Sequence, residues 1–175
     1  MKREILRAIA HIVFRGRRFN NRHVKRIAAG THDRAILEIG SGKPVKGEHR
    51  YSARVLFDES NDFVQTDVNP EFGHQILDVT TMEFEESFDI VLCVNVMEHV
   101  YEFRRAFDNV HRALKPGGTA LIGVPGYYPL HDEPHDYWRF TEHALRRLMS
   151  PYRSVKLWRS GPRRYPFAYF LEATK

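Results

Sequence analysis

A short apolar run that leads directly into a glycine turn is the strongest constraint on how this chain can fold. The stretch Ala35–Gly42 reads AILEIGSG, so one acid precedes a Gly-x-Gly turn. Such a run is typical of a strand that is buried on both faces of a parallel sheet. The glycines allow a tight turn at the carboxyl end of the strand, where open α/β sheets bind ligands. The sequence therefore predicts an α/β sheet with a ligand site at this turn.

The remainder of the chain alternates strand patterns with helix patterns. The expected strands cover residues 35–39, 63–65, 75–77, 90–94, 120–124, 154–159 and 167–173. The expected helices cover residues 2–14, 20–29, 100–114 and 141–149, with an interruption at Gly16, a stop at Lys115-Pro116-Gly117-Gly118 and an N-cap at Thr141. This order predicts a Rossmann-like, seven-stranded, mostly parallel sheet with an antiparallel last strand and helices on both faces.

The positive charge is concentrated at the N-terminus. Residues 1–30 carry nine Lys or Arg against one Glu, a net charge of +8, whereas the whole chain of 175 residues has +5. We expect a basic helical cap over residues 1–30 and one Rossmann-like domain over residues 31–175. The single cysteine, Cys93, lies in an apolar run, which favours a buried thiol and a cytoplasmic location.

Acids lie at or just after the ends of the first three predicted strands. Glu38 can accept from an ammonium or hydroxyl group, and Asp67 is placed to bind two ribose hydroxyls. Asp78, followed by Val79, can accept from the exocyclic amine of an adenine. The alternatives are a turn or N-cap aspartate at Asp67 and a solvated loop acid at Asp78. The third glycine of a dinucleotide fingerprint is absent, because position 45 is a valine and position 44 a proline.

The segments Phe88–His99 and Leu114–Gly118 carry a resemblance to a known family. They read FDIVLCVNVMEH and LKPGG. This pattern resembles the class I S-adenosylmethionine-dependent methyltransferases, in the small-molecule group that has His-x-x-Pro-x-Asp-Tyr-Trp-Arg-Phe-Thr after the fifth strand. That last motif is present at residues 131–141. A departure is Pro44, which predicts a shortened or distorted first helix within residues 43–62.

The resemblance implies a role for each matching residue. Glu38, Gly40, Ser41 and Gly42 would lie against the methionine part of S-adenosylmethionine. Asp67 would bind the ribose, Val68 would lie beside the adenine, and Asp78 and Val79 would bind the adenine edge. Asn95 and Val96 would lie near the sulfonium, with His99 near the acceptor.

The segment of residues 131–141 is the expected acceptor site. His131, His135 or Asp136 could act as a general base or orient one, and Tyr137 and Trp138 could stack on a substrate. We take His135, His99 and Tyr137 as the catalytic candidates. One alternative is a metal site of His131, Asp132 and His135, although we assign no metal ligand. The other is structural: Trp138 and Phe140 pack under the sheet while Arg139 pairs with an acid.

We therefore expect methyl transfer from S-adenosylmethionine to a small molecule, at an oxygen of a sugar or secondary metabolite. The alternatives are a nucleoside-binding module without catalysis, or a lipid-linked or RNA acceptor that is reached through the basic arm. The arm could cover the cofactor pocket, mediate dimerisation, or make a peripheral membrane contact through residues 1–20. Nucleic-acid binding ranks last, because the arm has no aromatic platform. The sequence leaves the oligomeric state open.

Overall fold

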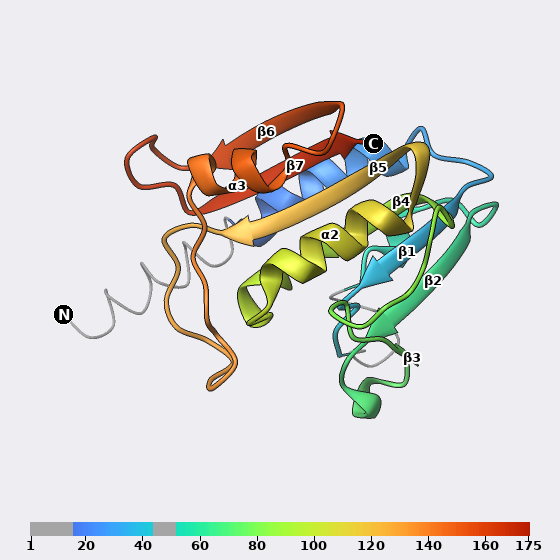
Figure 1. The fold of residues 1–175 in the computed structure, drawn as a ribbon, viewed down its shortest axis with the longest axis horizontal. Coiled ribbons are helices and arrows are strands. Elements are labelled where there is room, and N and C mark those ends of the chain that lie inside the picture. The colour runs from blue at the N-terminus through green and yellow to red at the C-terminus, as the bar shows by residue number, and fades with distance from the viewer. Residues whose placement is uncertain (1–15, 44–51) are drawn as a thin grey trace.

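The computed structural model describes residues 16–43 and 52–175, which form one mixed sheet with helices against it (Figure 1). The strands are β1 (Ala35–Ile39), β2 (Asp62–Asp67), β3 (Gln75–Ile76), β4 (Phe88–Val94), β5 (Leu114–Pro125), β6 (Ser154–Ser160) and β7 (Ala168–Thr174). The helices are α2 (Phe103–Ala113), α3 (Glu142–Leu148) and one whose described part covers residues 16–28. Three 3-10 turns lie at Arg54–Leu56, Pro70–Phe72 and Met97–His99.

The strand order β3-β2-β1-β4-β5-β7-β6 confirms the predicted fold class. Strands β1 to β5 pair in parallel, and β7 runs antiparallel to both β5 and β6. The chain moves outward from β1 to β3 and then returns to add β4 on the other side of β1. The carboxyl ends of β1 and β4 therefore form a topological switch point, where open sheets bind ligands.

Alternate residues of the central strands bury two separate cores. Leu37 and Val91 point to the face that α2 and α3 cover. Ile36 and Leu92 point to the opposite face, where Val24 in the helix of residues 16–28 packs against them. Figure 1 shows α2 in front of the sheet and that helix, in blue, behind it. This two-sided burial explains why the strands read as continuous apolar runs.

Several predicted boundaries were wrong. The helix of residues 16–28 includes Gly16, where we expected an interruption. Helix α2 begins at Phe103 instead of residue 100, after the 3-10 turn. Strand β5 begins at Leu114, so the LKPGG segment lies within the strand and not after the helix as a separate stop. A register shift between Phe88 and Ile90 accommodates these extra residues.

The Thr141 cap is confirmed, because its side chain accepts from the Ala144 nitrogen.

The expected helix of residues 2–14 lies outside the described residues, as does most of residues 1–20, for which a membrane contact was one alternative. Within the described ranges, no helix is both long and apolar enough to cross a bilayer. The described part of the predicted cap packs on the sheet through Val24 and Ala28. The division into a cap and a domain stays a prediction.

Candidate active site

The turn after β1 brings the backbone of β1 close to the end of β4. Gly40 and Gly42 have φ angles of 73° and 72°, in the region that favours glycine. A Cβ atom at Gly40 would overlap Cγ2 of Val96, which follows β4. The Ser41 nitrogen donates to the carbonyl oxygen of Thr66 at 2.9 Å. The glycines therefore allow the tight turn that the sequence predicted, and Gly40 also leaves room for the Val96 side chain.

Glu38 is an internal hydrogen-bond acceptor in this structure. Its carboxylate is buried and accepts from the Ser41 hydroxyl at 2.7 Å, from the Ser52 hydroxyl, and from the Ala53 nitrogen at 2.5 Å. Burial raises the pKa of this carboxyl, and the bonds from Ala53 and the two serines oppose that shift. Glu38 thus holds the glycine turn and the start of residues 52–62 together. Its contact with a ligand stays a prediction.

Asp67 lies at the end of β2 and faces the glycine turn. Oδ2 accepts from the Gly42 nitrogen and Oδ1 from the Asn69 nitrogen, both at 2.9 Å. The second bond is the turn contact that we gave as the alternative. Each carboxylate oxygen has a second lone pair, so both can accept ribose hydroxyls as well.

A first cavity, of about 290 Å³, opens beside Asp67. Six of the predicted cofactor residues line it: Gly40, Asp67, Val68, Asp78, Val79 and Val96. Val79 is buried, whereas Val68 and Asp78 are exposed at the rim. A wall of apolar side chains with carboxylates at one end suits a nucleoside, because the ring system packs on the wall and its hydroxyl and amino groups donate to the acids.

A second cavity, of about 190 Å³, adjoins the first one and shares Gly40 and His99 with it. Its described lining comes from β4 and the turn after it (Val94, Asn95, Glu98, His99), from the helix of residues 16–28 (Gly16, Arg17, Asn21), and from residues 125–132 and 167–168. Asn95 is fixed there, because its side-chain oxygen accepts from the Asn20 side chain at 3.2 Å and its backbone nitrogen donates to the Gly123 carbonyl at 2.8 Å. The cavity is smaller than sites for drug-sized ligands, which are roughly 300–1,000 Å³.

Glu98 is a buried acid at the second cavity. Its side chain is 1% exposed, and Oε2 has no hydrogen-bond partner among the described residues. Burial raises the pKa of the carboxyl to about 8. Glu98 belongs to the motif Phe88–His99, but we predicted no role for it from the sequence. The signal in the sequence was an acid four residues after the apolar run Ile90–Val94, beside a histidine.

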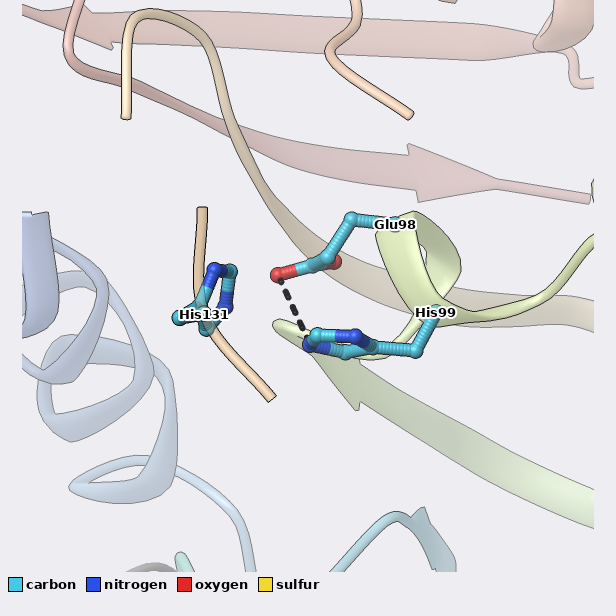
Figure 2. Close-up of side chains that lie close together, drawn as sticks. All are labelled: Glu98, His99 and His131. Carbon is cyan, nitrogen blue, oxygen red and sulfur yellow. Dashed lines mark ion pairs between the residues drawn. The ribbon is translucent and has the colours of Figure 1, made fainter. Parts of the chain in front are cut away.

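Two histidines face this acid. His99 and Glu98 come from the same 3-10 turn, and His131 lies opposite them on a separate segment (Figure 2). His99 Nε2 is 4.0 Å from Oε1 of Glu98. The imidazole rings of His99 and His131 are in edge contact, with centroids 4.8 Å apart. The sequence-based metal alternative grouped His131 with Asp132 and His135, whereas the structure brings His131 to Glu98 and His99.

Hydrogen bonds hold the segment of residues 131–141 in place, both within the segment and to the turn after β4. Arg139 donates to both oxygens of Asp136, at 2.6 and 2.7 Å, and these bonds hold the pKa of Asp136 well below its ordinary range. The Glu98 carbonyl accepts from the nitrogens of residues 137 and 138. Trp138 packs against Phe103, with ring centroids 5.0 Å apart. The structural alternative for Trp138, Arg139 and the buried Phe140 is thus what the structure shows.

The three catalytic candidates occupy different positions. His99 lines both cavities, and Tyr137 lines the first one. His135 is exposed and does not appear among the described lining residues of either cavity. Its Nδ1 lies 2.8 Å from the Tyr137 hydroxyl, and its carbonyl accepts from His99 Nδ1 at 2.7 Å. The catalytic roles of all three stay predictions.

Comparisons with known proteins agree with this geometry. Residues 38–122 match the family model described as a methyltransferase domain. Burkholderia thailandensis 1,6-didemethyltoxoflavin-N1-methyltransferase, solved with 1,6-didemethyltoxoflavin and S-adenosylhomocysteine, has a similar fold with a TM-score of 0.66. It shares 19% identity over 89% of this chain and 78% of its own. No curated protein sequence matches the chain.

Two further solved structures share the fold. Haemonchus contortus phosphoethanolamine N-methyltransferase 2 has a TM-score of 0.70 and 16% identity, over 89% of this chain and 52% of its own. An S-adenosylmethionine-dependent methyltransferase from Archaeoglobus fulgidus has a TM-score of 0.65 and 14% identity, over 91% of this chain and 94% of its own. The sheet order and the glycine turn give a Rossmann-like fold, and together with the match over residues 38–122 they support an S-adenosylmethionine-dependent methyltransferase.

Proposed function

We propose that the protein transfers a methyl group from S-adenosylmethionine to an oxygen of a small molecule, such as a sugar or a secondary metabolite. The observation that carries this proposal is the pair of cavities that meet at Gly40 and His99. The first is bounded by acids at strand ends, and the second by histidines and an acid. Cofactor and acceptor can therefore lie on opposite sides of one glycine, as an in-line transfer needs.

The first cavity has the features that the cofactor requires. We assign Asp67 to the ribose hydroxyls, Val68 to the adenine face, and Asp78 and Val79 to the adenine edge. The glycine turn and Glu38 would lie along the methionine part, and Asn95 and Val96 near the sulfonium. S-adenosylmethionine supplies an electrophilic methyl group, so the protein has to hold the acceptor in line and take up one proton.

The histidines of the second cavity support an oxygen acceptor. A hydroxyl group has to lose its proton as the new carbon–oxygen bond forms, whereas a neutral amine can attack first. His99 donates through Nδ1 to the His135 carbonyl, which leaves the lone pair of Nε2 for the cavity. We assign removal of the hydroxyl proton to Nε2 of His99. The Tyr137 hydroxyl and Nδ1 of His135, which lie 2.8 Å apart, would assist this proton removal from outside the second cavity.

Incubation with methyl-labelled S-adenosylmethionine and a panel of small hydroxyl, amino and thiol compounds tests this assignment. We expect label in a hydroxyl compound, with a product heavier by one methylene unit. His99→Ala should lower the rate at least about tenfold, whereas the same change at exposed His143 in α3 serves as the matched control. Transfer to amines alone would contradict the oxygen acceptor. Cofactor binding without transfer to any compound would favour the alternative of a nucleoside-binding module without catalysis. Transfer to lipid-linked or RNA acceptors alone would favour the alternative of an acceptor that is reached through the basic arm.

A further inference from the structure

Three potential metal ligands converge beside the second cavity. One ligand atom each from Glu98, His99 and His131 lies within 4.8 Å of the other two. Figure 2 shows the Glu98 carboxylate directed between the two imidazole rings, which come from two different segments. Two nitrogens and one carboxylate oxygen are the donor set of many protein sites for zinc and related ions.

The buried carboxylate lacks the partners that its environment demands. Glu98 is 1% exposed, yet Oε2 has no hydrogen-bond partner among the described residues and Oε1 is 4.0 Å from the nearest imidazole nitrogen. Buried carboxylates are normally paired with a cation, hydrogen-bonded, or bound to a metal. A cation between Glu98 and the two histidines would provide this missing partner.

Both histidines are oriented by bonds to their other ring nitrogen. His99 Nδ1 donates to the His135 carbonyl at 2.7 Å, so its Nε2 keeps a lone pair. His131 Nδ1 lies 3.2 Å from Oδ2 of Asp136 and 3.3 Å from the Pro129 carbonyl. Asp136 is itself held by Arg139. A metal-binding histidine almost always donates its second N–H to a carboxylate or a carbonyl in this way, because that bond fixes the ring and its tautomer.

We propose that Glu98, His99 and His131 bind one divalent transition-metal ion, such as Zn²⁺, at the wall of the second cavity. Two imidazole ligands favour first-row transition ions over Mg²⁺ or Ca²⁺, which prefer oxygen. Bonds of about 2.0–2.2 Å in tetrahedral geometry place ligand atoms about 3.4 Å apart. The distances between the three ligand atoms would therefore shorten by roughly 1 Å on binding. Rotation of the two partly exposed imidazole rings can supply this movement.

The ion would keep an open position toward the cavity. Glu98, His99 and His131 all line that cavity, so a hydroxyl of the acceptor could take the fourth position. A bound divalent ion would lower the pKa of a coordinated hydroxyl, so that its proton could leave to solvent while Nε2 of His99 serves as a metal ligand and not as the base. This role rests on the proposed function, whereas the binding of the ion does not depend on it.

Calorimetric titration of the chelator-treated protein with Zn²⁺ tests the site without any assay of activity. We expect one equivalent to bind, and Co²⁺ should give a visible absorption band of a low-symmetry site. Glu98→Gln and His131→Ala should each weaken Zn²⁺ binding at least about tenfold. His143→Ala, which removes an exposed histidine elsewhere, should leave the affinity unchanged.

Failure to bind one equivalent of Zn²⁺ in the wild-type protein would overturn the proposal, and this result does not depend on whether a variant folds. Equal affinities of wild type and a folded His131→Ala protein would overturn it too. Binding of S-adenosylhomocysteine is measured in parallel. Its absence would count against the proposed function and not against the metal site.

Discussion

The carboxylate of Asp67 accepts a hydrogen bond from the backbone nitrogen of Gly42 at 2.9 Å. This bond joins the turn after β1 to the end of β2, so the first cavity has a fixed edge. Because the same carboxylate lines that cavity, a ligand that it binds would contact a rigid part of the turn.

Replacing Asp67 by alanine should weaken binding of S-adenosylhomocysteine about 10- to 100-fold. Hydrogen bonds to a charged group contribute about 1.5–3 kcal/mol, and the variant loses those to the ribose. Calorimetry measures the affinity. Asp62→Ala at the exposed start of the same strand is the matched control, with no expected change. An unchanged affinity in a folded Asp67→Ala protein would contradict the ribose assignment.

Replacing Gly40 by alanine should destabilise the fold more than the same change at Gly73. Both glycines have φ of 73°, which costs alanine about 1–2 kcal/mol. A Cβ at Gly40 overlaps Val96, whereas nothing lies within 4 Å of one at Gly73. Overpacking adds about 1–3 kcal/mol at Gly40 alone. Urea unfolding gives both free energies.

The double variant Gly40→Ala with Val96→Ala provides the internal check. Removing the Val96 methyl groups should recover part of the loss that is specific to Gly40. Equal destabilisation at Gly40 and Gly73 would show that the close approach of Val96 plays no role in stability.

Asp89→Asn should lower the free energy of unfolding by about 1 kcal/mol at pH 7. Burial alone would raise the pKa of Asp89, but the Lys115 ammonium at 2.9 Å and the Ala35 nitrogen outweigh it and hold the pKa low. A lowered folded-state pKa gives stability that is present above the unfolded-state pKa, about 3.9, and is lost as the pH falls below it.

Unfolding of the wild type and Asp89→Asn, compared from pH 7 to pH 3, checks this sign. The difference should be constant above about pH 5 and shrink below about pH 4. Asp108→Asn, on the exposed side of α2, is the control. A difference that grows toward acid pH would be incompatible with the Lys115 ion pair.

The convergence of strand-end residues around the first cavity could be predicted from the sequence because its determinants are local. Each of these residues lies at or just after the end of a strand, and parallel strands bring their carboxyl ends to one edge. Asp67, Asp78 and Val79 therefore meet around one cavity although they come from separate segments. The hydrogen bonds of Glu38 were less predictable, since Ser52 and Ala53 lie 14 and 15 residues away.

The arrangement around the second cavity depends on tertiary contacts that no periodicity reveals. His131 reaches Glu98 because the segment after β5 folds back and its nitrogens at residues 137 and 138 donate to the Glu98 carbonyl. The motif at residues 131–141 looked like a set of catalytic side chains. In the structure Asp136 and Arg139 form an ion pair that stabilises the segment. Of its two histidines, only His131 lies with Glu98 and His99.

Calorimetric titration of the wild-type protein with S-adenosylhomocysteine is the most direct test of the central claim. The account predicts binding of one molecule per chain, and competition by S-adenosylmethionine for the same site. An absence of heat and of competition, in protein that unfolds cooperatively and is therefore folded, would contradict the assignment of the first cavity to this cofactor.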